Sequence, residues 1–301
     1  LADRKLVGKL SGKSQITVSF ENLSVTDELY VSNIEFVAID PQLKSTKKGK
    51  ITVPVVIVNY LPTNDGILLD MQRAPDGFYD VVSHARDIEA LVFDHLGYES
   101  AVLVGGDLGG PVIQEMALRN SNRVKRMVLF NSPLPMDKER MAGMRTRPPV
   151  EVMDYFIRQG TDADALASEL DTEEKRADYI GAFYSTRLWA HPGAFNADDI
   201  AWHVEPFCDA QKLRASFANY ESAFDATKRV EKPLYGRNTI TPTLILFGTS
   251  DHVIYPDFDL MAATVFDIHD EPIRIENCGH FVPWEAVEEF IFRTVEFCRE
   301  N

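Results

Sequence analysis

The sequence has few cysteines and no long apolar run. Only three of its 301 residues are cysteine, an odd number without a Cys-x-x-Cys spacing, which argues against a disulfide framework or a zinc site. No apolar run approaches the roughly 18–20 residues that cross a bilayer, so no membrane span is expected. Unpaired thiols favour a reducing cytoplasm, whereas secretion stays open because the sequence begins at Leu1 rather than Met.

Basic residues are also in short supply. Lys and Arg number 31 against 46 Asp and Glu, which gives a formal net charge of -15. Phosphate binding needs clustered basic side chains, so nucleic acid is not expected as a partner. The one basic run, at residues 44–50, lies among Ser, Thr and Gly and is typical of a solvated loop. A hydrophobic content of 45% is ordinary for a globular protein with a large core.

Short apolar runs alternate with helical patterns along most of the chain. Residues 15–20 and 28–39 alternate apolar and polar side chains, as half-buried antiparallel strands do. Apolar runs that are typical of strands covered on both faces are found at 51–58, where 53–58 is continuously apolar, and at 101–104, 127–130 and 243–247. The short run Ile-Arg-Ile at 273–275 is a further strand candidate. Helical spacing is found at 82–96, which Gly97 ends, and at 111–119 and 284–298. The alternation predicts an α/β fold with a mostly parallel sheet flanked by helices.

The strand signal disappears between about residues 134 and 237. This stretch is helix-forming and rich in aromatic residues, among them Tyr155, Tyr179, Tyr184, Trp189, Trp202 and Tyr220. We interpret it as a helical cap inserted between two strands of the sheet. The predicted domains are an α/β core formed by residues 1–133 and 238–301, and a cap formed by residues 134–237.

A glycine-rich segment, Gly-Gly-Asp-Leu-Gly-Gly at residues 105–110, lies between a predicted buried strand and a predicted helix. A nucleophile on such a strained bend needs neighbours with almost no side chain, and Gly105 and Gly109 meet this need. The N-terminus of the helix would favour a carboxylate there. By itself the segment is equally consistent with a flexible turn in which Asp107 caps the helix.

Two downstream residues change this balance. Asp251 follows the predicted strand at 243–247, and His280 lies on the loop after the predicted strand at 273–275. Nucleophile, acid and histidine in this chain order are typical of the α/β-hydrolases. We therefore predict Asp107 as a nucleophile, Asp251 as the acid that orients the histidine, and His280 as a general base.

From about residue 78 to its C-terminus the chain resembles the epoxide hydrolase and haloalkane dehalogenase branch of the α/β-hydrolases. The resemblance rests on His-Ala-Arg-Asp-Ile at 84–88, Val-Leu-Val-Gly-Gly-Asp-Leu-Gly-Gly at 102–110, Phe-Gly-Thr-Ser-Asp at 247–251 and Gly-His-Phe-Val-Pro-Trp-Glu at 279–285. It implies attack of Asp107 on an sp³ carbon, followed by hydrolysis of the resulting alkyl ester by water that His280 activates. The backbone N–H of Leu108 would be one oxyanion donor.

Epoxide opening needs an acid for the developing alkoxide, and the resemblance implies that tyrosines of the cap supply it. Tyr220, in the segment Ser-Phe-Ala-Asn-Tyr at 216–220, is the first candidate. Tyr184 is the second and Tyr179 the third. Packing is the alternative role for each of these side chains.

Halide displacement would instead need N–H donors, often a Trp directly after the nucleophile. Leu108 occupies that position, which favours epoxide opening, although Trp189 or Trp202 could bind halide. The predicted function is hydrolysis of a small apolar epoxide by water to a diol. A haloalkane or haloacid dehalogenase with the same ester mechanism is the alternative.

No motif indicates a metal or a cofactor, since the glycine-rich turn lacks the full Gly-x-Gly-x-x-Gly spacing. The sequence does not determine the oligomeric state, and a homodimer is possible.

The sequence departs from the family before the glycine-rich segment. The family has His-Gly-x-Pro after its third strand, whereas the nearest match here is Asn-Tyr-Leu-Pro at residues 59–62. Compared with the family, the interval from this segment to Asp107 is shorter by about the length of one helix. Residues 67–73 are predicted as the next strand, and no sequence for the helix before it is evident. The second oxyanion donor, provisionally the N–H of Leu61, therefore has altered surroundings, and a catalytically silent hydrolase-fold protein is a third hypothesis. Where some relatives place their acid, after Phe130, this chain has Asn131, which favours Asp251 for that role.

Overall fold

The computed structural model describes residues 77–146, 154–186, 188–254 and 257–299, together with the backbone of five earlier strands. The chain divides into two compact units, residues 1–53 with 61–72 and residues 54–60 with 73–301. The predicted segments at 59–62, which includes Leu61, and at 67–73 lie outside the described residues.

The described strands of the first unit form two antiparallel pairs. β2 (Gly12–Phe20) and β3 (Leu23–Val31) pair along their whole length. β1 (Lys5–Leu6) pairs with β4 (Phe36–Val37). The antiparallel strand predicted at 15–20 is therefore confirmed. The single strand predicted at 28–39 is wrong, because that stretch contains the end of β3 and the separate β4, with the turn-favouring pair Ser-Asn between them in the sequence.

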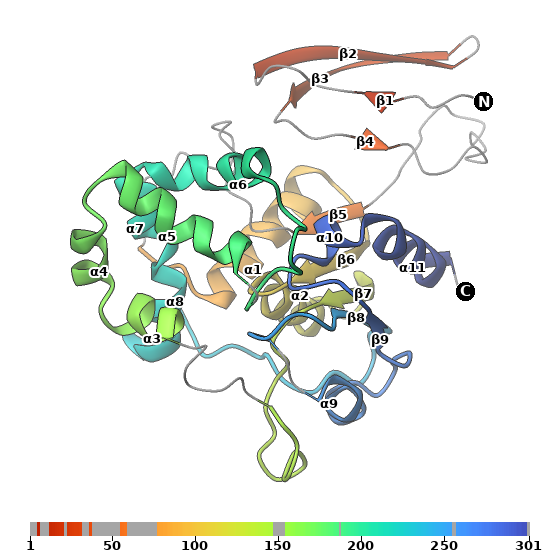
Figure 1. Cartoon of the computed structure of the whole chain (residues 1–301). Helices are drawn as coiled ribbons and strands as arrows, with labels where there is room; N and C mark the ends of the chain where they lie inside the picture. Colours follow the sequence, from red (N-terminus) through yellow and green to blue (C-terminus); the bar gives the residue numbers. More distant parts are fainter. Residues whose placement is uncertain are drawn as a thin grey trace. The chain divides into compact units, whose positions relative to one another are not determined.

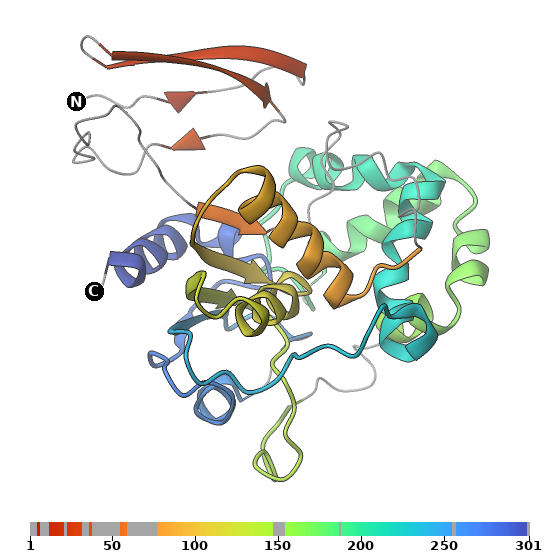
Figure 2. The same ribbon diagram turned by 180° about the vertical axis from the view of Figure 1, so that it is seen from behind.

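The described strands of the second unit form one parallel sheet (Figures 1 and 2). Their order in the sheet follows their order in the chain: β5 (Val55–Val58), β6 (Ala101–Gly106), β7 (Val124–Phe130), β8 (Thr243–Gly248) and β9 (Ile273–Ile275). Parallel strands align their C-terminal ends at one edge of the sheet. The residues that follow β6, β7, β8 and β9 therefore meet at that edge, which is where ligands bind in open α/β sheets.

Helices cover both faces of this sheet, as predicted. Consecutive strand residues point to opposite faces, so Leu103 and Met127 enter one apolar core while Val104 and Val128 enter another. The first core also contains residues of α1, α2 and α9, and the second those of α10 and α11. These helices are α1 (Val81–Glu89, continued by a π-helical turn at Ala90–His95), α2 (Gly109–Arg119), α9 (Phe258–Val265), α10 (Val282–Glu285) and α11 (Val287–Arg299).

Two predicted helix ends can be compared with the structure. Gly97, with φ of +71°, lies just after the first helical stretch, as predicted from its freedom to adopt a left-handed backbone. The helix predicted at 284–298 is confirmed from Val287 onward as α11, but its predicted start is wrong, because Ala286 has a non-helical backbone, with φ −137° and ψ 51°, and separates α10 from α11.

The described residues between β7 and β8 contain helices and no strand. The α-helices are α3 (Asp154–Thr161), α4 (Ala163–Glu169), α5 (Glu173–Ser185), α6 (Ala197–Val204), α7 (Ala210–Ser216) and α8 (Ala218–Phe224). They enclose a small core of their own, with Leu166, Leu213 and Phe217 fully buried. Thr172 and Asn196 cap the starts of α5 and α6 through their side chains. No helix in the described part of the chain is long and apolar enough to span a membrane.

Candidate active site

Asp107 occupies the sharp bend between β6 and α2, with φ of +42°. A Cβ atom at Gly105 would lie 2.7 Å from the carbonyl oxygen of Gly109, so strand and helix approach this closely only with glycine there. The Asp107 N–H donates to the carbonyl of Asn131 at 3.1 Å, and the Ser132 hydroxyl donates to the Asp107 carbonyl at 3.2 Å. These bonds hold a strained backbone that leaves about a third of the Asp107 side chain exposed (34%).

Asp251, just beyond the end of β8, is completely buried. Its Oδ1 accepts hydrogen bonds from the N–H groups of Val253 at 2.8 Å and Ile254 at 3.0 Å. Its Oδ2 accepts from His280 Nδ1 at 2.8 Å and from the side-chain amide of Asn131 at 2.6 Å. Four donors therefore compensate the loss of solvent around this carboxylate and fix its orientation.

Asn131 has a role that the sequence did not reveal. It is buried at the end of β7 and has φ of +35°. Its amide donates to Asp251, while its Oδ1 accepts from the N–H of Gly248 at 2.7 Å. Asn131 thus ties the ends of β7 and β8 together directly behind the carboxylate that faces His280. The only sequence signal was its position, since its partners lie more than a hundred residues further along the chain.

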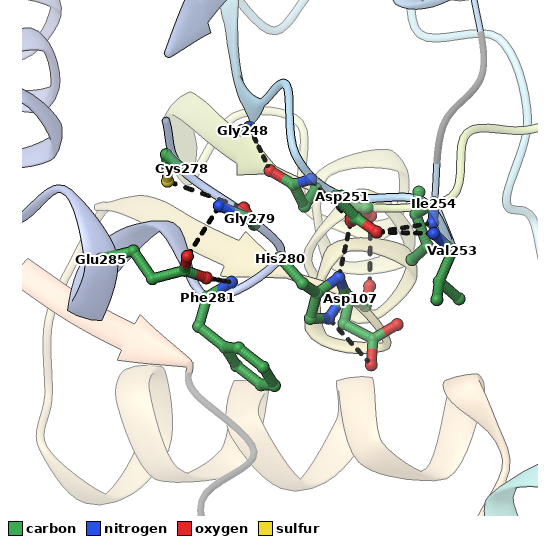
Figure 3. A network of polar contacts seen from close by, with 12 residues as sticks. Asp107, Gly248, Asp251, Val253, Ile254, Cys278, Gly279, His280, Phe281 and Glu285 are labelled. Atoms are coloured by element: carbon green, nitrogen blue, oxygen red, sulfur yellow. Dashed lines mark hydrogen bonds and ion pairs between the residues drawn. The ribbon is translucent and has the colours of Figure 1, made fainter. Parts of the chain in front are cut away.

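His280 lies between the two carboxylates (Figure 3). Its Nδ1 faces Asp251, and its Nε2 lies 3.7 Å from Asp107 Oδ2. Burial is the largest influence on the pKa of His280 and lowers it, but Asp251 and Asp107 together outweigh burial and raise that pKa to about 10. At neutral pH the ring of His280 is therefore protonated. The structure brings together all three residues that the sequence singled out for this site.

Two tyrosines from different helices lie next to each other, and one of them, Tyr155, lies near Asp107. Tyr155, on α3, and Tyr220, on α8, have ring centroids 6.0 Å apart in an edge-to-face arrangement. Burial raises the pKa of Tyr155 well above its ordinary value, and the nearby Tyr220, Asp107 and Asp251 raise it further. Tyr220 was predicted for this region and Tyr155 was missed. No motif surrounds Tyr155, and only the packing of α3 on α8 brings it to Tyr220.

Tyr184, the second tyrosine candidate, has different neighbours. Its ring stacks on His203 at 4.6 Å and on Phe281 at 4.8 Å, and burial raises its pKa. The third candidate, Tyr179, accepts a hydrogen bond on its hydroxyl from Gln159 at 2.9 Å. These contacts favour packing roles for both tyrosines.

The two tryptophans considered for halide binding also differ in position. Trp189 is buried, and its ring lies edge-on to His280 at 4.8 Å and to Tyr155 at 5.0 Å. Trp202 is partly exposed and packs against His203 and Trp284 instead. Of these two indoles, Trp189 is the one beside the catalytic candidates.

Leu108 directly precedes α2 and follows Asp107 at the bend. Its N–H is therefore in the position expected of an oxyanion donor, whereas the other candidate donor, Leu61, lies outside the described residues. In the described part of the chain, no group of three or more His, Cys, Asp or Glu side chains is arranged to hold a metal ion.

Comparison with known proteins identifies the family. A family model described as alpha/beta hydrolase fold matches residues 71–287, which is well over half of the chain. The solved structure of the epoxide hydrolase CorEH without ligand has a TM-score of 0.59 and 22% sequence identity, and the match covers 72% of this chain and 74% of that one. At this identity the likeness shows the fold.

Curated relatives include proteins with different activities. The soluble epoxide hydrolase of Corynebacterium sp. (strain C12) is 28% identical over 233 residues, 76% of each chain. Haloalkane dehalogenase 2 of Mycobacterium tuberculosis (strain ATCC 25618 / H37Rv) is 25% identical over 231 residues, 75% of this chain and 74% of that protein. The chain therefore belongs to the α/β-hydrolase superfamily, in which its relatives include an epoxide hydrolase and a haloalkane dehalogenase.

Proposed function

We propose that this protein is an epoxide hydrolase that converts an apolar epoxide to a diol through an alkyl ester on Asp107. The observation that carries the proposal is the tyrosine pair: Tyr155 lies close enough to Asp107 for that carboxylate to raise the pKa of the tyrosine, and Tyr220 lies next to Tyr155. We infer that a hydroxyl of this pair donates a proton to the alkoxide that forms near Asp107. The helices between β7 and β8, which contribute both tyrosines, would then act as the cap over the active site. The similarity to the Corynebacterium soluble epoxide hydrolase supports the same activity.

In the first step, Asp107 attacks one carbon of the epoxide. A carbon–oxygen ester bond forms as the ring carbon–oxygen bond breaks, and the ring oxygen takes a proton from Tyr155 or Tyr220. The products are a hydroxyalkyl ester and a tyrosinate. This step uses the carboxylate of Asp107 directly and needs no base.

In the second step, water attacks the ester carbonyl. Esterification removes the negative charge of Asp107, one of the groups that raise the pKa of His280, so the ring can pass its proton to the tyrosinate. Neutral His280, held by Asp251, then accepts a proton from the attacking water. The Leu108 N–H would stabilise the tetrahedral oxyanion, and collapse of this intermediate releases the diol and the Asp107 carboxylate.

Haloalkane dehalogenation is the second candidate function. The buried Trp189 beside His280 favours it, as does the similarity to haloalkane dehalogenase 2. Leu108 disfavours it, because no indole N–H follows the nucleophile directly.

The test is an assay of styrene-type and aliphatic epoxides for diol formation, combined with mass spectrometry of the His280→Gln variant during turnover. We expect diol from the wild type and an adduct of epoxide mass on the peptide that contains Asp107 in the variant. His95→Gln, which changes an exposed histidine, serves as the matched control and should form diol without accumulating adduct.

The alternatives give different results. Halide release from haloalkanes together with inactivity on every epoxide would assign the dehalogenase reaction. Absence of any adduct on Asp107 with either substrate class would mean that the protein does not use this ester mechanism.

A further inference from the structure

Three consecutive backbone N–H groups around His280 are hydrogen-bonded outside the parallel sheet. The N–H of Gly279 donates to Glu285 Oε2 at 2.8 Å, and that of Phe281 donates to Glu285 Oε1 at 2.9 Å. Between them, the N–H of His280 donates to the carbonyl of Trp189 at 2.7 Å. Figure 3 shows the Glu285 side chain turned back from α10 toward this loop. The backbone of His280 is thus fixed by one carboxylate and one carbonyl.

The segment 188–191, which belongs to the helical region between β7 and β8, contacts both loops that carry the acid and the histidine. The N–H of His191 donates to the same Glu285 oxygen as Gly279, at 2.8 Å. The carbonyl of Leu188 accepts from the N–H of His252 at 2.9 Å, and the His191 ring is hydrogen-bonded to the Ser250 hydroxyl at 3.1 Å. Glu285 therefore joins this segment to the histidine loop.

Glycine at position 279 makes this junction possible. A Cβ atom there would collide with the carbonyl oxygen of Trp189 and would lie 2.7 Å from the N–H nitrogen of His191. The two backbones therefore pass in direct contact, with the Glu285 carboxylate bridging them. Such a junction transmits a displacement of one backbone to the other, because packed interiors have little free volume.

We propose that Glu285 is a positioning residue that sets the position and orientation of His280 by accepting three backbone hydrogen bonds. Through these bonds it also couples segment 188–191 to His280. Its effect is geometric rather than electrostatic, because burial and the carboxylates of Asp251 and Asp107 are the main influences on the pKa of His280. A glutamine has one acceptor oxygen and an NH₂ group that would face a donor. Glu285→Gln therefore loses at least one of the three hydrogen bonds and places an N–H group against a backbone donor, while nearly preserving side-chain volume.

The proposal rests on the proposed ester mechanism and predicts unequal effects on its two steps. Ester formation uses Asp107 and the tyrosines, whereas ester hydrolysis needs His280 in place. Misplacement of a reacting group by about an ångström costs up to about 100-fold, so Glu285→Gln should slow ester hydrolysis about 10- to 100-fold. The rate of ester formation should be unchanged, and the adduct should accumulate as it does in His280→Gln.

The kinetic experiment measures both steps in single-turnover reactions by quenched-flow mass spectrometry. Glu288→Gln, an exposed glutamate at the start of α11, is the matched control and should resemble the wild type. Equal slowing of both steps in Glu285→Gln, or no slowing of hydrolysis, would overturn the proposal, because a variant that is merely less well folded loses both steps in proportion.

A second measurement needs no substrate and separates this proposal from the proposed function. The proton between His280 Nδ1 and Asp251 should give a strongly deshielded signal in the proton NMR spectrum of the wild type and of Glu288→Gln. In Glu285→Gln we expect this proton to exchange with water faster and its signal to broaden or vanish. An unchanged signal would overturn the positioning role, whereas failure of the proposed function alone would appear as a wild type that forms no adduct on Asp107.

Discussion

At the scale of single residues, left-handed backbones mark the C-terminal edge of the sheet. Within the described ranges, the non-glycine residues with positive φ are Asp107, Asn131 and Asn277, at +42°, +35° and +57°. They lie just after β6, β7 and β9. Such conformations cost energy and persist only where surrounding bonds enforce them. At Asp107 and Asn131 the strain coincides with residues that carry the proposed chemistry or support it.

Asn131 is the residue whose removal should expose this support. In Asn131→Ala the buried carboxylate of Asp251 and the N–H of Gly248 each lose a partner, so we expect the free energy of unfolding to fall by about 1–3 kcal/mol. Denaturant titration measures this change. Asn122→Ala, at an exposed position, is the control and should stay within about 0.5 kcal/mol of the wild type. Equal stability of both variants would contradict the bridging role of Asn131.

The tyrosine pair gives a second prediction at this scale. Tyr155→Phe or Tyr220→Phe, each made in the His280→Gln background, should slow ester formation from an epoxide by about 100-fold or more, because an acid for the alkoxide is lost. Tyr184→Phe should have little effect, because that ring packs between His203 and Phe281. Adduct formation followed by mass spectrometry ranks the three variants. A larger effect for Tyr184→Phe than for the other two would reverse the assignment.

At the scale of elements, the sequence predicted the strands that are covered on both faces. The runs at 101–104 and 243–247 correspond to β6 and β8 because burial on both faces demands continuous apolar residues. The break between α10 and α11 was missed, because helical periodicity continues across Ala286. The pairing of Tyr155 with Tyr220 could not be predicted, since it depends on how α3 packs on α8. Sequence order indicated Asp107, Asp251 and His280, but gave no sign of the Asn131 and Glu285 hydrogen bonds around them.

Asp80 tests how one element is anchored. Its buried carboxylate accepts hydrogen bonds from the Val82 N–H at 3.0 Å and the Ser83 hydroxyl at 2.8 Å, which caps α1. It also accepts from the N–H of Val230 at 3.1 Å, on the chain returning from the helical region. Loss of the cap in Asp80→Ala should lower the free energy of unfolding by about 1–2 kcal/mol. Chemical denaturation measures this change, with Asp94→Ala, at an exposed position, as the control. Equal stability of Asp80→Ala and Asp94→Ala would contradict the anchoring role of Asp80.

At the scale of the whole molecule, the charge of His280 links stability to pH. Its pKa in the folded protein is about 10, against an ordinary value of 6.5. The folded state therefore binds this proton more tightly than the unfolded state does. The resulting stabilisation is fully present below pH 6.5, decreases as the pH rises from there, and is lost above about pH 10.

The pH prediction is tested by the free energy of unfolding of wild type and His280→Gln between pH 6 and pH 10.5, a window set by the two pKa values of His280. The wild type should lose on the order of a few kcal/mol more than the variant across this interval, because each pKa unit corresponds to about 1.4 kcal/mol. Other groups that titrate at high pH are common to both proteins and cancel in the difference. Asp107→Asn should show an intermediate loss, because one of the two carboxylates that raise the pKa of His280 is gone while Asp251 remains. Parallel curves for wild type and His280→Gln would mean that folding does not raise the pKa of His280, and the proton transfer from His280 to the tyrosinate would then have no basis.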